Sequence, residues 1–418
     1  MEGTSRIKNR GKGQSHPGTP RSKATKALLH PDSDPEQLLQ QSVGRLCSSP
    51  PSHLSSKDQA LLKHYVHHVS GLLSSTDDRT INTYCNTILR MAWDSNLLMN
   101  TLLLVSASHL AGRSEQTALD VPHYRHRVLP ELRAYVANWQ GFDKIILATI
   151  IMMSINEVFE ANPDTWVTHL KAVSQIISRN LPQWKTCDQE TRMLLDIFAY
   201  HSVLALIGTN QSSLFMDYYR GDTWSALKGH RGAFLAAADQ IISFVAKLSE
   251  LFPASPADGP PEPIEPSRLA RARSLKADME HWDPPREISS DACNTAQSMR
   301  YAGLLYYHKL TSSSLTECDR EEILSYCRAI VRHIGQVSLD SPSAASHTWP
   351  LYMAGSFLNS RTGIADQETQ DFIKERLAAL KLRRGVRTID SVRDRLELVW
   401  KSDGTDLAVL DAPLILLW

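Results

Sequence analysis

Apolar residues return every three or four positions over much of the chain, the spacing that places them on one face of an α-helix. The first such run starts after a Ser/Pro-rich stretch and comprises Leu61, Leu62, Tyr65, Val66, Val69, Leu72 and Leu73. Ser55 and Ser56 precede it, where a hydroxyl can accept from free backbone N–H groups. This pattern predicts an amphipathic helix with a capped start.

Two segments are apolar on most faces, which is typical of helices buried inside a bundle. They are Leu97–Ala111 and Asp143–Phe159, and Gly112 is placed to stop the first of them. Between them, Tyr124–Trp139 is amphipathic with a basic exposed face, and Pro130 predicts a kink or a break into two helices. The two apolar segments are therefore the expected core of the protein.

The pattern continues beyond residue 160. After a turn at residues 162–164, one apolar stripe is formed by Trp166, Leu170, Val173 and Ile177. Six prolines at 252–267 predict an exposed loop, and helical spacing then resumes at 286–312, 319–338, 350–358, 366–382 and 388–401. The apolar end, Leu407–Trp418, is expected to dock on the body. Sustained strand alternation is absent from the sequence, so we predict an all-α fold, a large multi-helix bundle or irregular helical array.

The composition indicates where the helical domain begins. Of 418 residues, 42% are apolar and 22% charged, which is typical of a globular protein. Residues 1–57 are polar, basic and rich in Ser and Pro, so we expect a disordered tail followed by a helical domain at 58–418. The tail can act as a nuclear import signal, bind phosphate loosely, or simply be solvated. The most apolar internal run, Ile145–Met153, is too short for a bilayer, so no membrane association is expected.

The charge and the cysteines exclude some kinds of site. The 45 basic and 45 acidic side chains balance, so any nucleic-acid contact must come from a local patch. Six cysteines are scattered without a CxxC pair, which favours buried, reduced, inert thiols: Cys47, Cys85, Cys187, Cys293, Cys318 and Cys327. A zinc cluster that binds DNA needs about six cysteines within about thirty residues, and these cannot form one.

Three groups of side chains could carry chemistry, and each also has a structural interpretation. The first comprises His64, His67 and His68, with His123 and His126 further on; a pair at i and i+4 can bind a metal or lie on a polar face. Glu157 and Glu160 can do acid–base work or bridge helices. The third group, which could suggest a nucleophile, comprises Ser106, Ser108 and His109. In the structural interpretation, the small serines permit close helix packing, with their hydroxyls bonded to the i−4 carbonyl. Nucleophile-elbow, phosphate-loop and zinc-helix motifs are absent, so we assign no catalytic, cofactor or metal residue and predict a protein that is not an enzyme.

Several of these segments are similar to landmarks of a known family. The strongest is Leu147–Ile177, with its apolar helix, acidic exit and Trp–His–Leu stripe, and the others are Leu61–Asp78, Asn100–Ala111, Tyr124–Arg133, His347–Phe357 and Val392–Trp400. In order and spacing they resemble the fungal-specific transcription factor domain of zinc-cluster regulators, in the branch of the acriflavine-sensitivity-control type. The resemblance covers about residues 58–401.

The resemblance implies an all-α regulatory domain, a nuclear location and control of transcription. The family places this domain after a zinc cluster, which residues 1–57 do not resemble. Three hypotheses follow. In the first, the chain is a regulator that works with a DNA-binding partner or a homo- or heterodimer partner. In the second, the gene model omits an upstream zinc-cluster exon. In the third, the chain is a small-molecule-binding helical module or an enzyme that has repurposed the fold. A metabolic or biosynthetic gene cluster is a candidate target, and a small metabolite is a candidate effector.

Overall fold

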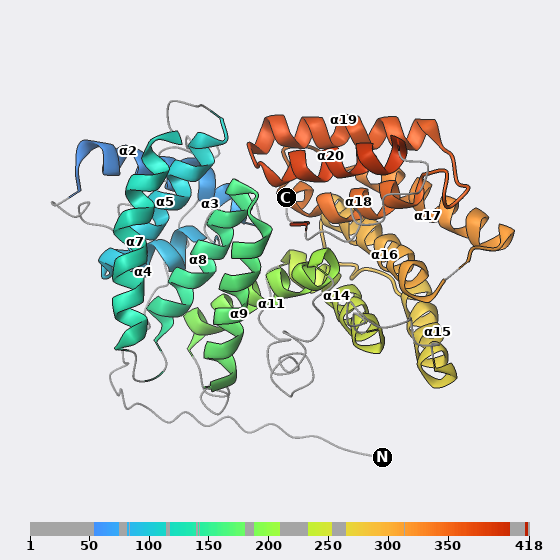
Figure 1. Ribbon diagram of the computed structural model, residues 1–418, viewed down its shortest axis with the longest axis horizontal. Coiled ribbons are helices and arrows are strands. Elements are labelled where there is room, and N and C mark those ends of the chain that lie inside the picture. Colours follow the sequence, from blue (N-terminus) through green and yellow to red (C-terminus); the bar gives the residue numbers. More distant parts are fainter. Residues whose placement is uncertain are drawn as a thin grey trace, which may run out of the picture. The chain divides into compact units, whose positions relative to one another are not determined.

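The computed structural model describes residues 54–74, 82, 84–113, 118–138, 141, 143–179, 188–209, 233–252, 265–312, 314–401 and 414–416. Helices are the regular elements of these residues, and they include no strand (Figure 1). The all-α prediction is therefore confirmed. The predicted N-terminal tail up to residue 53 and most of the proline-rich loop, residues 253–264, lie outside the described residues.

The first helical stretch is built from three consecutive elements: α2 (Ser56–His64), the π-helical turn η1 (Tyr65–Val69) and α3 (Ser70–Leu73). Ser55 caps it, because its hydroxyl accepts from the Asp58 N–H at 3.1 Å while the Asp58 carboxylate accepts from the Ser55 N–H at 3.1 Å. This reciprocal pair satisfies two free donors, and the cap prediction is confirmed. All but Leu72 of the predicted apolar positions are buried.

Two helices form the centre of the N-terminal half, as their composition predicts: α5 (Asn96–Ala111) and α8 (Lys144–Glu160). They pack on each other, and α7 (Asp120–Ala137) covers α5 while α9 (Pro163–Arg179) covers α8. The predicted stripe of α9 is at most 2% exposed. The short elements η3 (Tyr84–Ile88) and α4 (Leu89–Trp93) lead into α5.

Of the kink or break predicted at Pro130, the break is wrong, because α7 continues through this residue. Proline removes one backbone N–H and so frees the carbonyl of His126 four residues earlier. Both residues are exposed, so water can satisfy that carbonyl and the cost of the lost hydrogen bond stays small.

The rest of the described chain forms a second group of helices around α16 (Ser290–Thr311), which packs on α14 (Ala233–Leu251), α15 (Pro266–Glu280), α17 (Glu317–Gly335) and α18 (Thr348–Phe357). The 3₁₀ turn η5 (Pro342–Ser346) precedes α18, and α11 (Gln189–Thr209) contacts both α8 and α14. The start of α15 at Pro266 corrects the predicted loop, since proline fits the first turn of a helix.

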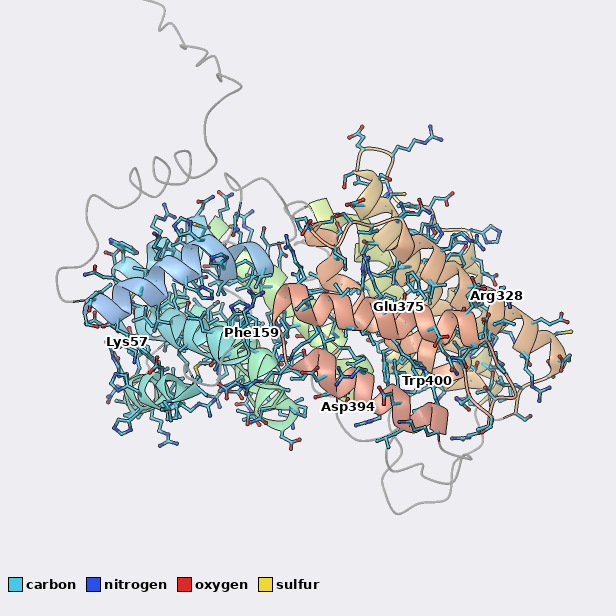
Figure 2. All side chains as sticks on the ribbon, turned by 90° about the horizontal axis from the view of Figure 1, so that it is seen from above. Lys57, Phe159, Arg328, Glu375, Asp394 and Trp400 are labelled. Carbon is cyan, nitrogen blue, oxygen red and sulfur yellow. The ribbon has the colours of Figure 1, made fainter. Side chains whose placement is uncertain are left out.

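The last two helices, α19 (Gln367–Arg384) and α20 (Thr388–Lys401), lie side by side (Figures 1 and 2). Trp400 on α20 donates from Nε1 to the Gly355 carbonyl of α18 at 2.8 Å, and the Lys374 ammonium of α19 lies 5.2 Å from its ring centre. Trp400 thus ties α20 to both of its neighbours.

The chain end returns to α11. Leu414, Ile415 and Leu416 are at most 5% exposed, and the Leu414 N–H donates to the Gly208 carbonyl at 2.9 Å. Docking of the apolar end is confirmed for these three residues; residues 402–413 lie outside the described ones. A search of the described residues finds no helix with the length and apolar character that a membrane span needs.

Candidate functional site

The histidine-rich turn of the sequence contacts a histidine from another helix. Nε2 of His64 lies 2.8 Å from Nδ1 of His109 on α5, and Nε2 of His109 lies 2.9 Å from the backbone oxygen of Arg384. A carbonyl only accepts, so His109 carries its proton on Nε2 and its Nδ1 accepts from His64. The contacts therefore fix the tautomers of both rings without a metal.

The pKa values of His64 and His109 are both lowered, as expected for two neutral rings. Burial, followed by the charges of His109 and His68, lowers the pKa of His64 to about 3. Burial also lowers the pKa of His109 to about 4, although the hydrogen bond to Arg384 acts in the opposite direction. Above pH 6 both rings are uncharged, as hydrogen bonding between them requires.

Arginines at the end of α5 and at the junction of α19 with α20 each donate a hydrogen bond to a backbone carbonyl of the other segment. Arg113 donates to the Arg383 carbonyl at 2.7 Å, and Arg387 donates to the Ala111 carbonyl at 2.9 Å. A Cβ on Gly112 would lie only 2.6 Å from the Gly385 oxygen. Gly112 ends α5 as predicted, but with an ordinary φ of −67°, so the close backbone approach and not a left-handed turn requires glycine.

Arg384, the last residue of α19, is 4% exposed. Its Nη2 donates to the Leu72 carbonyl of α3 at 2.7 Å, and its buried Nε has no hydrogen-bond partner. Among the described residues it forms no ion pair with a carboxylate, and burial lowers the pKa of its guanidinium to about 10. Arg384 thus carries a buried charge that no acidic side chain of the described residues neutralises.

Polar groups of α11, of η5 and its junction with α18, and of α19 itself lie near this arginine. Tyr200 of α11, which interacts electrostatically with Arg384, lies with its hydroxyl 2.9 Å from Ser346 Oγ in η5. His347 is fully buried, and burial, followed by Arg376 and Arg384, holds its pKa well below the ordinary range. Nη2 of Arg376 donates to His347 Nδ1 at 3.4 Å. We call these five residues, Arg384, Arg376, His347, Tyr200 and Ser346, the Arg384 cluster.

The two glutamates considered for acid–base chemistry bridge helices. Arg125 of α7 lies 2.5 Å from Glu160 and 3.7 Å from Glu157, and Ser108 Oγ of α5 donates to Glu160 at 2.9 Å. Glu160 thus joins α5, α7 and α8, which matches the structural interpretation. The expected i−4 bonds of Ser106 and Ser108 are wrong: Ser108 bonds to Glu160, and Ser106 Oγ is buried without a partner.

A further cluster joins α15, α16 and α17. The ligand atoms of His308, Asp319 and Glu322 lie within 4.8 Å of one another, as a metal site requires. However, the Lys276 ammonium lies 2.8 and 3.0 Å from the two Glu322 oxygens. Burial raises the pKa of Glu322, but hydrogen bonds from Lys276 and Tyr326 outweigh it and leave the carboxyl below its ordinary value. Lysine thus already supplies the positive charge, and we interpret the cluster as an ion-pair network.

The remaining predicted residues lie apart from these clusters. His123 and His126 are exposed on α7. Cys85 and Cys327 are buried, and burial raises the pKa of the Cys327 thiol, as expected for inert cysteines. Cys318 is exposed, which corrects the expectation of burial for this residue, and Cys47 and Cys187 lie outside the described residues.

Sequence reasoning missed the Arg384 cluster and the His308 cluster. Arg384 stands in the run KLRRG, which reads as the solvated basic end of a helix, and its partners are far away in sequence. The glycine that follows, Gly385, is a local sign in the sequence that the helix ends there. Its φ of +69° is a left-handed backbone conformation that glycine adopts readily.

Comparison with known proteins identifies the family. The family model described as the fungal specific transcription factor domain matches residues 60–411. Neither a curated protein nor a solved structure matches the chain significantly. The matched region covers most of the sequence and nearly every described helix. The chain therefore belongs to the fungal-specific transcription factor domain family.

Proposed function

We propose that this chain regulates transcription of fungal genes in the nucleus through the helical domain at residues 58–418. The observation that carries the proposal is the family match over residues 60–411. Proteins of this family are regulators, so we propose no enzymatic activity for the chain. A metabolic or biosynthetic gene cluster is the target class we propose.

We further propose that the helical domain reaches promoters through a partner, either a DNA-binding protein or a second regulator with which it dimerises. Two features of the sequence support this. The formal net charge is zero, so the chain as a whole offers no excess of cations for displacing counterions from DNA. The cysteines are too far apart for a zinc cluster within the printed sequence.

The test is the distribution of a tagged full-length chain on chromatin in its native host. We expect discrete enrichment at promoters above an untagged strain. A protein spread through the cytosol, with no promoter enrichment, would contradict the regulatory function.

A matched pair of variants shows whether the folded helical domain is what reaches chromatin. Leu103→Asp places a charge at a position of α5 that is fully buried, and we expect it to unfold the domain and abolish the peaks. Leu382→Asp makes the same change where the side chain is 85% exposed, and the peaks should remain. Peaks that survive Leu103→Asp at equal protein level would assign recruitment to another part of the chain.

A further inference from the structure

We propose that Arg384 anchors a binding site for a small molecule bearing a carboxylate or phosphate group. This site goes beyond transcriptional regulation, and its test does not depend on that function. It is argued from the burial of the arginine, from the lack of a carboxylate partner among the residues that the structure describes, and from the polar groups gathered around it.

Two other arginines of the described chain, both partly buried, differ from Arg384 in their partners. Arg125 and Arg127 are about one-third exposed, and each still faces a carboxylate, Glu160 at 2.5 Å and Asp58 at 2.9 Å. Arg384 is far more buried, at 4% exposure, and has no such partner among the described residues. Because a charge removed from water is costly unless it is paired, the most buried arginine is the one that most needs an anion.

The hydrogen bonds of Arg384 leave part of its guanidinium free. Nη2 donates to the Leu72 carbonyl, but Nε is buried and unpartnered. Buried donors are normally satisfied, so an orphan of this kind calls for an explanation such as a bound ion or ligand. Guanidinium groups recognise carboxylates and phosphates through just such N–H donors.

Neighbouring groups extend the donor set. The Tyr200 hydroxyl and Ser346 Oγ lie 2.9 Å apart, so one of them donates to the other and the accepting hydroxyl keeps its own proton to donate to an anion. Arg376 adds a second positive charge: its Nη2 donates to His347, and its own Nε is also buried without a partner. Asp291 interacts electrostatically with Arg376, whereas no carboxylate of the described residues forms an ion pair with Arg384. The charge of Arg384 therefore favours a negative ligand.

A purely structural role for Arg384 is the alternative. Leu72 stands at the C-terminal end of α3, where backbone carbonyls carry partial negative charge, so the guanidinium also caps that helix. Capping accounts for Nη2 and leaves Nε unexplained. The two roles predict different effects of added anions on the stability of the fold. An anion-binding site is stabilised by the anion, whereas a helix cap is not.

The experiment follows thermal unfolding of the full-length protein in sodium succinate, sodium phosphate and sodium chloride at equal ionic strength. We expect succinate or phosphate to raise Tm by ~2 °C or more above chloride and to saturate, because a ligand that binds only the folded state stabilises it. A rise with succinate alone assigns a carboxylate ligand, and a rise with phosphate alone assigns a phosphate ligand.

Variants separate binding at Arg384 from general salt effects. Arg384→Met removes the charge and should abolish the difference between the anions, whereas Arg383→Met, at the exposed neighbour, should keep it. If Arg384→Met does not fold, Arg384→Lys keeps a charge but loses Nε, and should raise the half-saturating anion concentration by ~10-fold or more. A flat response of the unchanged protein, or an equal rise in the Arg384 variants, would overturn the proposal.

Discussion

At the scale of single residues, burial and backbone acceptors decide the protonation of the interior histidines. His109 is 1% exposed and donates to a carbonyl that can only accept, while its other nitrogen accepts from His64. Protonation would turn that acceptor into a donor facing another donor. The neutral ring is therefore part of the contact that joins α5 to the end of α19.

This arrangement predicts that acid weakens the fold through His109. Its pKa is lowered from 6.5 to about 4 in the folded protein, so the unfolded chain binds more protons between these values. The stabilisation is complete above pH 6.5 and is lost as the pH falls towards 4. At about 1.4 kcal/mol per pH unit, His109 accounts for about 3 kcal/mol over this range. Urea unfolding at a series of pH values measures it.

The variant His109→Gln isolates this contribution. We expect it to lower the free energy of unfolding by about 1 kcal/mol at pH 7, where a hydrogen bond is lost, but to flatten the decline below pH 6.5. His126→Gln, on the exposed face of α7, is the control and should keep the original slope. If His109→Gln and the unchanged protein decline in parallel, burial of His109 is not the source of the acid sensitivity.

At the scale of elements, the contact between α5 and the α19–α20 junction depends on two glycines. Gly112→Ala would place a methyl group 2.6 Å from the Gly385 backbone oxygen, which cannot move without shifting the chain. We expect a loss of about 1–3 kcal/mol in the free energy of unfolding, the range for overpacked sites. Thermal or urea unfolding measures the change.

Gly71→Ala is the matched control for this effect. Gly71 lies in α3, is exposed, and has no atom within 4 Å of the position its Cβ would take. Alanine favours a helix over glycine, so this change should stabilise the protein by about 0.5–1 kcal/mol. The explanation by close approach would be wrong if both substitutions changed stability in the same direction.

The helices also show how much of the fold could be predicted from the sequence. Apolar spacing located α5, α8 and α9 and the helices from α16 onwards, because each buries a stripe or most of its surface. It missed α15, in which Ala272 and Met279 are buried and most other positions are polar. That helix is held by polar contacts from its neighbours, since Arg300 donates to the Met279 and Glu280 carbonyls and Lys276 pairs with Glu322. Such contacts leave no periodic signal.

At the scale of the whole molecule, the contacts that matter most join residues far apart in sequence. Arg384 and Leu72 are separated by 312 positions, and His109 and Arg384 by 275. Nothing in a local pattern distinguishes Arg384 from the exposed Arg383 beside it. The helices were predictable because their signals are local, whereas the candidate site was not, because it exists only where α3, α11, η5 and α19 meet.

The docking of the chain end on α11 is another contact between residues far apart in sequence. We expect it to contribute measurably to the free energy of unfolding. Leu416 is 1% exposed, and the backbone of Leu414 is bound to Gly208 on α11. Leu416→Ala should therefore lower the free energy of unfolding by about 2–3 kcal/mol, through lost burial and the cavity left behind. Leu382→Ala, at a side chain that is 85% exposed, should cost less than about 0.5 kcal/mol. Equal effects of the two substitutions in urea unfolding would mean that the chain end does not pack on the body in solution.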